Sequence, residues 1–136
     1  MTKRTARTPT IEDVLGPLAA AIMRVIWREG ESTVATVAAR VADDRPRAPA
    51  YTTVMTVMGR LHERGLLIRE KRGRQFVYRA PRSEPDTIER LSQVAVEDLV
   101  ARFGTTAYRQ FALRLAEVDP VTRARLAELA SRHEES

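Results

Sequence analysis

Four small or weakly polar residues recur at helical spacing near the middle of the chain. They are Thr52, Met55, Thr56 and Gly59. Their offsets of three, four and seven residues from the first would place all four on one side of a helix. A threonine hydroxyl can hydrogen-bond the edge of a nucleobase, threonine and methionine can touch a thymine methyl group, and glycine lets another backbone approach closely. This side of the helix therefore has the chemistry of a surface that contacts base pairs in the major groove of DNA.

The opposite side of the same segment is apolar and predicts a helix over residues 52–64. Gly65 supplies the helix stop, and Arg60 and Arg64 flank the polar side, where they could reach phosphate groups. An ordinary amphipathic surface helix rich in threonine is the alternative. Threonine is a mediocre helix former, so an exposed threonine cluster without a binding role is less expected. The apolar stripe consists of Val54, Val57, Met58 and Leu61.

Two segments of strand character follow, over residues 66–71 and 75–80. Gly73 between them is a turn signal, so the two segments predict a β-hairpin. We expect Arg72 and Arg74, beside the turn, to contact phosphate; a solvated edge hairpin that uses charge to prevent aggregation is the alternative. The cations of the hairpin are Arg69, Lys71, Arg72, Arg74 and Arg79.

Two more helices are predicted ahead of these elements. Apolar residues at helical spacing begin at Leu15, and the helix they predict ends at Gly30. A short second helix would be capped by Ser32 or Thr33 and broken by the two prolines within residues 43–50. Three helices followed by a basic hairpin match a helix-turn-helix unit with a wing, in which the second helix of the motif enters the major groove.

The rest of the chain is predicted to be helical. A linker at residues 81–85 precedes helices at about 86–103, 105–117 and 120–133. About fifty residues in three helices cannot remove all their apolar surface from water alone, so we expect them to pair with a second copy of the chain. Packing on the N-terminal domain is the alternative. The residues expected in the dimer contact are Ile88, Leu91, Leu99, Tyr108, Phe111, Leu115, Leu126 and Leu129.

These elements predict a mostly α fold with a small β-hairpin. We expect a flexible basic arm over residues 1–14, a winged helix-turn-helix domain over 15–82 and a three-helix dimerisation segment over 83–136. Residues 1–82 carry 16 Lys and Arg against 8 Asp and Glu, a net charge of +8, whereas residues 83–136 carry 7 against 10, a net charge of −3. The basic half suits a polyanion such as nucleic acid.

Composition and patterning argue against a membrane protein. A membrane-surface protein would need a basic amphipathic helix with aromatic anchors, whereas the cations here concentrate on the hairpin. The apolar stretch at residues 15–27 is too short to span a bilayer and is interrupted by Arg24. The chain has no cysteine, which excludes disulfides and thiolate metal sites and suits a reducing compartment. We therefore expect no membrane partner and a cytoplasmic location.

An enzymatic function has little support in the sequence. The two histidines, His62 and His133, belong to no nucleophile, metal or phosphate-loop motif. The acidic pair Asp43 and Asp44 lies in a loop beside arginines, where the requirements of a turn and of charge balance explain it. We expect no catalytic residue, no metal and no cofactor.

Two segments of the chain resemble the penicillinase-repressor family, also called BlaI/MecI. They are residues 51–67, YTTVMTVMGRLHERGLL, and residues 22–27, IMRVIW. The likeness covers residues 15–80 well and residues 83–136 in architecture. It implies a dimeric winged-helix repressor of resistance genes. The operator contacts that it implies are Thr52, Met55 and Thr56, and the phosphate contacts are Thr53 and Arg60.

The chain departs from two patterns within that family. The copper-responsive branch carries C-terminal cysteines, and the antibiotic-responsive members are cleaved at an Asn–Phe pair; this chain has neither cysteine nor asparagine. The resemblance also raises a sensor-linked protease, acting on the C-terminal segment, as a further partner.

The sequence therefore predicts a sequence-specific DNA-binding transcriptional repressor that binds an inverted-repeat operator, a double-stranded DNA site, as a homodimer. A winged-helix module that binds protein and does not contact DNA is the alternative, because a fold alone does not fix a function.

Overall fold

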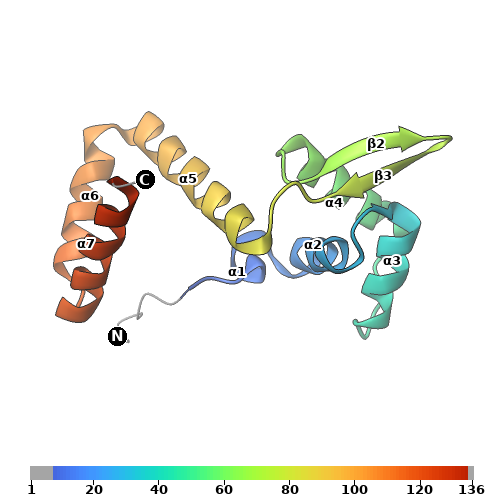
Figure 1. Ribbon diagram of the computed structural model, residues 1–136, viewed down its shortest axis with the longest axis horizontal. Helices are drawn as coiled ribbons and strands as arrows, with labels where there is room; N and C mark the ends of the chain where they lie inside the picture. Colours follow the sequence, from blue (N-terminus) through green and yellow to red (C-terminus); the bar gives the residue numbers. More distant parts are fainter. Residues whose placement is uncertain (1–7, 135–136) are drawn as a thin grey trace. The chain divides into compact units, whose positions relative to one another are not determined.

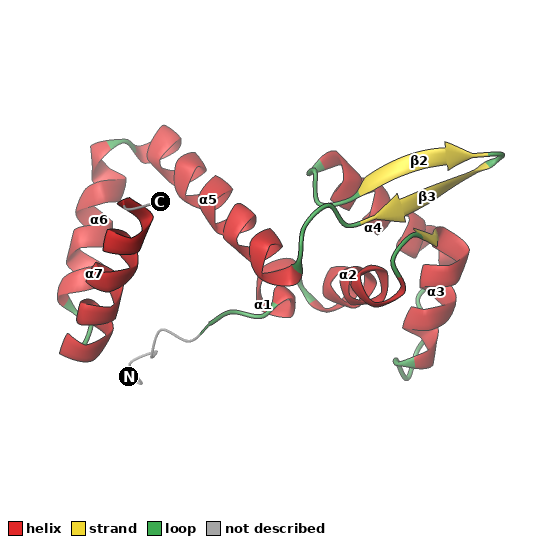
Figure 2. Ribbon diagram, in the orientation of Figure 1, coloured by secondary structure: helices red, strands yellow, loops and turns green. Residues whose placement is uncertain are grey.

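The computed structural model describes residues 8–134, which divide into two compact units (Figures 1 and 2). One unit contains Pro9–Leu91, and the other is built on the chain from Ser92 on. The first unit holds α1 (Ile11–Leu15), α2 (Pro17–Glu29), β1 (Ser32–Thr33), α3 (Val34–Asp43), α4 (Tyr51–Glu63), β2 (Ile68–Arg72) and β3 (Gln75–Arg79). The last three helices are α5 (Glu84–Phe103), α6 (Thr105–Ala116) and α7 (Pro120–Glu134). The fold is mostly α-helical with a small sheet, as predicted.

The segment that precedes α2 forms a short helix. The hydroxyl of Thr10 accepts a hydrogen bond from the backbone N–H of Asp13 at 3.3 Å, and the Asp13 carboxylate accepts one from the backbone N–H of Thr10 at 2.8 Å. This capping box starts α1, and the fully buried Ile11 anchors it in the core. The predicted flexible arm therefore does not extend to residue 14, and residues 1–7 of that arm lie outside the described residues.

The helix α2 begins and ends at residues suited to helix termini. Pro17 occupies the first turn of α2, where its missing N–H costs no hydrogen bond. Gly16 before it has φ of +88°, a conformation that glycine adopts without strain. The helix ends at Gly30, as predicted, and it buries Ile22, Met23 and other side chains in the core.

The sequence allows Ser32 or Thr33 as the cap of α3, and the structure shows that Thr33 is the cap. Its hydroxyl accepts a hydrogen bond from the backbone N–H of Thr36 at 3.2 Å. Ser32 is instead buried in β1, and its hydroxyl donates to the carbonyl of Gly30 at 3.1 Å. The proline-containing segment 44–50 then separates α3 from α4, as predicted, so that the two helices form a helix-turn-helix unit.

A three-stranded antiparallel sheet follows the order β1-β3-β2 (Figure 2). The hairpin of β2 and β3 confirms the prediction, with Gly73 in the turn at φ of +65°. We call this hairpin and its turn the wing. β1 pairs with the far side of β3, where Ser32 lies opposite Tyr78 and Thr33 opposite Val77. The sequence did not predict β1, because a two-residue strand has no recognisable alternation.

The core of the first unit lies where α2, α3 and α4 meet the base of the sheet. Each element contributes apolar side chains at its own period, three to four residues in the helices and two in the strands. The fully or almost fully buried members include Met23, Ile26, Val37, Val41, Val54, Met58, Leu66, Leu67 and Tyr78.

The segment that leads into α5 is held against the first unit. The indole N–H of Trp27 on α2 donates to the carbonyl of Arg82 at 2.8 Å, and the Arg82 guanidinium donates to the carbonyl of Gly65 at 3.4 Å. These two bonds fix the chain just before Ser83, whose carbonyl then accepts a hydrogen bond from the buried hydroxyl of Thr87 at 2.8 Å.

The first turns of α5 complete the core of the first unit. Leu91 is buried in that core, and Ile88 packs against it. Ile88 and Leu91 were predicted to lie in the dimer contact; in the single chain Leu91 is buried and Ile88 is partly buried against the core of the first unit. The boundary between the two units consequently falls after Leu91, inside α5, and not at residue 83.

The second unit contains the end of α5, followed by α6 and α7, close to the predicted helical ranges. Gly104, at φ of +58°, separates α5 from α6. Asp119 caps α7, because its carboxylate accepts hydrogen bonds from the backbone N–H and the hydroxyl of Thr122, each at 2.8 Å. Within the described part of the chain, these helices pack on one another much less than α2, α3 and α4 do.

Candidate nucleic-acid interface

α4 has a buried side and an exposed side, as its sequence predicts. Val54, Met58 and Leu61 are buried where α4 packs on α2 and α3. The opposite side faces solvent, and Met55 there is 46% exposed although it is apolar. The structure thus places the five predicted contact residues of α4 at the surface; they are Thr52, Thr53, Met55, Thr56 and Arg60. Gly59 is half-buried.

The hydroxyl of Thr56 is already a hydrogen-bond donor inside the helix. It donates to the backbone carbonyl of Thr52 at 2.9 Å. In this rotamer the hydroxyl proton is occupied, while the lone pairs and the methyl group of Thr56 stay available at the surface. Thr56 is therefore arranged to accept a hydrogen bond from a base amino group or to touch a thymine methyl.

Tyr51 is an exposed aromatic residue that sequence reasoning did not select. It is the first residue of α4 and is 53% exposed, one turn ahead of Met55. Its signal was present in the sequence, because an aromatic residue four positions before a surface methionine falls on the same flank of a helix. A large side chain with a phenol at its tip suits an interface that is partly apolar and partly wet.

Arg72 on the wing is held by two carboxylates. Its guanidinium donates to both oxygens of Glu31, at 2.8 and 3.1 Å, and to Glu70 at 3.2 Å. The hydrogen bonds and charge of Arg72 lower the pKa of Glu31 below its ordinary value, with a smaller contribution from the charge of Arg79. Arg72 was predicted to be a phosphate contact, and in the structure its guanidinium makes three hydrogen bonds to the carboxylates of Glu31 and Glu70.

The other cations of the wing differ in their surroundings. The guanidinium of Arg69 lies over the ring of Phe76, 4.2 Å from its centroid, in a cation–π contact. Lys71 is exposed on the same side of β2, opposite Phe76 in the register of the hairpin. Arg74 is exposed in the turn. In the part of the chain that the structure describes, neither Lys71 nor Arg74 forms an ion pair.

The predicted dimer residues of the second unit are exposed in the single chain. They are Leu99, Tyr108, Phe111, Leu115, Leu126 and Leu129, with Tyr108 the most exposed at 60%. Val94, Val96, Phe103, Leu113 and Val121 are exposed as well and add to the apolar surface. Such a concentration of exposed apolar side chains is unusual for a monomeric soluble protein.

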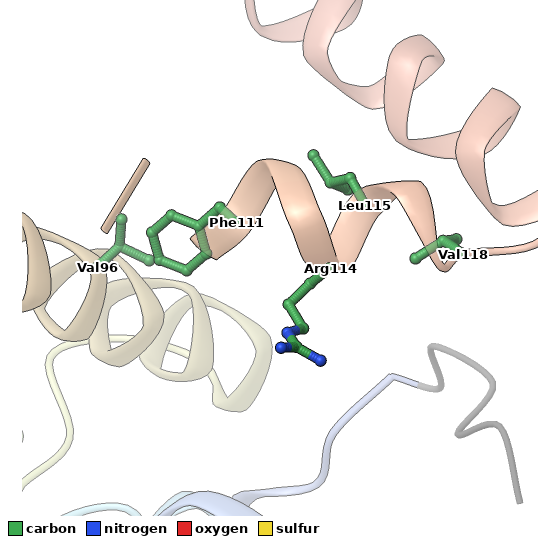
Figure 3. Close-up of a pocket in the computed structure, with 5 residues that line it drawn as sticks. All are labelled: Val96, Phe111, Arg114, Leu115 and Val118. Carbon is green, nitrogen blue, oxygen red and sulfur yellow. The ribbon is translucent and has the colours of Figure 1, made fainter. Parts of the chain in front are cut away.

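A shallow apolar pocket lies within this surface (Figure 3). Its volume is about 370 Å³, and its lining comes from Val96 on α5, Phe111, Arg114 and Leu115 on α6, and Val118 after α6. The ring of Phe111 points toward Val96, so these two side chains line the pocket from different helices. The pocket is thus part of the apolar surface that the predicted dimer would cover.

Neither a metal cluster nor a membrane span is found in the residues that the structure describes. No three His, Cys, Asp or Glu side chains within this range are grouped so that they could hold a metal ion. No helix within the same range is long and apolar enough to cross a membrane.

A family comparison connects this geometry to a known class of protein. Residues 15–135 match the family model described as penicillinase repressor. The chain belongs to the penicillinase repressor family. The match extends through the winged helix and through the three C-terminal helices. Membership of this family supports a winged-helix, DNA-binding transcriptional regulator over the alternative of a protein-binding module.

Two solved structures are similar to this chain over much of its length. Both are crystal structures of an organohalide-sensing transcriptional regulator, one bound to 2,4-dichlorophenol and one ligand-free. The TM-scores are 0.40 and 0.39, and the sequence identities are 16% and 17%. Each alignment covers 87% of this chain and 61% of the other. Comparison with curated proteins gives no match.

Proposed function

We propose that this repressor binds an inverted-repeat operator as a homodimer and places α4 in the major groove. The observation that carries the proposal is the division of α4 into two sides. One side is fixed in the core through Val54 and Met58, while the other presents threonine and methionine side chains to solvent. A helix held in this way offers its exposed side chains at defined positions, as the recognition of base edges requires.

The residues of the interface fall into two groups, those that would contact base edges and those that would contact phosphates. Thr52, Met55 and Thr56 would contact base edges and so determine sequence preference. Thr53 and Arg60 on α4, together with Arg74 in the wing turn, would contact phosphates and so position the protein on any sequence. All six side chains are exposed in the structure.

Pairing of two copies through the second unit is supported by its exposed apolar side chains. Three helices that pack little on one another bury their apolar surface only against another molecule. A two-fold pair also supplies a second recognition helix, and an operator with matching two-fold symmetry then follows. We place the protein in the cytoplasm, a reducing compartment that suits a chain without cysteine.

The operator is tested by selection of bound duplexes from a random-sequence pool with the full chain. We expect an inverted repeat whose half-site centres lie about 10 base pairs apart, or a multiple of this distance. Binding to the selected duplex is then titrated with salt. Six to ten phosphate contacts predict a loss of roughly 10³ to 10⁵ in affinity between about 50 and 200 mM salt. A flat salt response, or selected sites without two-fold symmetry, would contradict the proposal.

Release from DNA is proposed to follow damage to the second unit by a sensor-linked protease. We place the cut between Tyr108 and Val118, within the apolar surface that pairing would cover. Residues 108–116 belong to α6, and a protease would have to unwind this helix because it needs an extended substrate. Residues 117–119 lie between α6 and α7 outside any helix, so a protease could cut there without unwinding a helix. Mass spectrometry of the fragments in induced cells tests this site.

A further inference from the structure

The side chain of Arg72 ties one edge of the wing to the opposite edge of the sheet. Arg72 lies on β2, whereas Glu31 directly precedes β1, and β3 runs between these two strands. The bidentate contact between the two side chains therefore spans the width of the sheet. It joins residues far apart in the chain and connects the wing to the end of α2.

The contact has the features that distinguish an ordered ion pair from an incidental one. Isolated surface ion pairs contribute little, but bidentate arginine–carboxylate pairs and small networks are better ordered. Here Glu70, two residues before Arg72 on the same side of β2, adds a second carboxylate. The charge of Arg72 lowers the pKa of Glu31, and the carboxylates raise the pKa of Arg72, so both stay ionised near neutral pH.

A phosphate contact by Arg72 would break this arrangement. The guanidinium would have to exchange two carboxylates for one phosphate, and Glu31 and Glu70 would then face a polyanion without the hydrogen bonds and charge of Arg72. Arg74 in the turn and Lys71 on the other side of β2 need no such exchange, because within the described chain they form no ion pair. Among the cations of the wing, Arg72 is thus held by carboxylates, whereas Lys71 and Arg74 are available.

We propose that Arg72 is a positioning residue, which fastens the wing to the helical body through Glu31, and that Arg74 supplies the phosphate contact at the wing turn. This inference rests on the proposed operator binding. If Arg72 positions the wing through Glu31, a substitution of Glu31 should weaken DNA binding. This is the opposite of what charge alone predicts, because the substitution removes a negative charge from a protein that binds a polyanion.

The first experiment measures the wing in the free protein and needs no DNA. Hydrogen exchange of the full-length chain is followed for peptides that cover residues 68–79 in the parent, in Glu31→Gln and in Arg72→Gln. Loss of the contact should speed exchange of the hairpin amides about two- to fivefold in both variants. Glu89→Gln is the matched control, because Glu89 is an exposed carboxylate of the same unit with no ion pair among the described residues. Unchanged exchange in Glu31→Gln overturns the inference.

The second experiment measures affinity for a labelled random-sequence duplex at several salt concentrations. Glu31→Gln should weaken binding about two- to fivefold, whereas Glu89→Gln should leave binding equal or slightly tighter. If Arg72 is a phosphate contact, Glu31→Gln must instead tighten binding, because a competing carboxylate is gone. Tighter binding in Glu31→Gln therefore overturns the inference.

A double variant that swaps the charges of residues 31 and 72 is a further test of whether Arg72 positions the wing or contacts phosphate. The double variant Glu31→Arg with Arg72→Glu can rebuild the pair in reverse. Recovery of slow hairpin exchange and of duplex affinity, relative to Arg72→Glu alone, supports positioning. Failure of the double variant to recover either quantity counts against it. If the parent chain does not bind DNA, the proposed operator binding is wrong. The hydrogen-exchange data still decide whether Glu31 and Arg72 hold the wing.

Discussion

Thr56 carries the sharpest expectation about base recognition, because its hydroxyl proton is already used by the carbonyl of Thr52. Thr56→Ala removes both the acceptor oxygen and the methyl group. It should lower discrimination at one base pair of each half-site by about 1 to 3 kcal/mol and leave non-specific binding nearly unchanged. Competition between the selected operator and single-base variants measures this.

Thr56→Val is the matched control for the kind of contact. Valine keeps a methyl group at the same place and loses only the oxygen, at similar helix propensity. Retained discrimination in Thr56→Val identifies a thymine methyl contact, and lost discrimination identifies a base amino group. An unchanged site preference in Thr56→Ala would show that α4 does not contact bases through this residue.

Arg74 should behave in the opposite way to Thr56. Arg74→Ala removes an exposed cation from the wing turn, so it should weaken binding to every duplex alike and reduce the salt slope by about 0.9. Salt titrations on the operator and on a random duplex check both statements. Arg90→Ala, which removes an exposed charge from α5, is the control and should leave the slope unchanged. A loss confined to one sequence would mean that Arg74 contacts a base.

At the scale of elements, α7 depends on the ionised form of its cap. The hydrogen bonds from the backbone and hydroxyl of Thr122 lower the pKa of Asp119 below its ordinary value of 3.8. A carboxyl whose folded pKa is depressed contributes stability that is present above the unfolded value and is lost as pH falls through the folded value. Acidification below about pH 4 should therefore fray the start of α7.

Circular dichroism as a function of pH tests the cap when the parent is compared with Asp119→Asn. Asparagine is an equally good cap and does not titrate, so the variant should lose less helix on acidification. The difference between the two curves isolates this one carboxyl from the other acidic groups. Identical acid transitions would show that the charge of Asp119 does not hold α7.

Most elements could be predicted from the sequence because each has a strong local signal. The stripe of α4, the glycine turn of the wing and the breaks before α6 and α7 all lie within a few residues of the elements they define. β1 could not be predicted, because its two residues become a strand only by pairing with Val77 and Tyr78. The start of α1 was missed although its capping box of Thr10 and Asp13 is a local signal, because a helix of five residues is too short to show a helical period.

The candidate site also has one part that could be predicted from the sequence and one part that could not. The exposed side of α4 follows from helical geometry, so its residues could be named from spacing alone. The state of Arg72 could not, because its partner Glu31 lies far away in the chain and meets it only across the folded sheet. The packing of Ile88 and Leu91 on the core of the first unit could not be predicted, because an apolar stripe does not reveal which surface covers it.

At the scale of the whole molecule, the boundary inside α5 predicts where the chain can be shortened. A chain that ends at Arg82 loses Leu91 and Thr87 from the core of the first unit, whereas a chain that ends at Leu91 keeps them. The shorter chain should be less stable by about 2 kcal/mol or more, as expected for the loss of one buried aliphatic side chain and its neighbours. Urea unfolding of the two chains measures the difference, and equal stability would place the boundary earlier.

Pairing of two chains should depend on the apolar side chains of α6. Phe111→Arg replaces the ring that lines the pocket with a second guanidinium beside Arg114, and it should give a monomer in analytical ultracentrifugation. Operator affinity should fall by about 10² to 10⁴, because the second half-site is no longer bound by a tethered unit. Gln110→Arg, next in the chain but off the apolar stripe, is the control. A Phe111→Arg chain that stays dimeric and binds normally would place the pairing surface elsewhere.

The hydrogen bond between Trp27 and the carbonyl of Arg82 gives the protein an internal optical probe. Trp27 is the single tryptophan of the chain and is half-buried on α2. Its emission therefore comes entirely from the first unit, whereas far-ultraviolet circular dichroism records the helices of both units. A comparison of the two signals during unfolding separates loss of the DNA-binding unit from loss of the C-terminal helices without any label. Because the indole is hydrogen-bonded to Arg82, just before α5, a change in its emission wavelength should report the release of this segment from α2 in the intact protein.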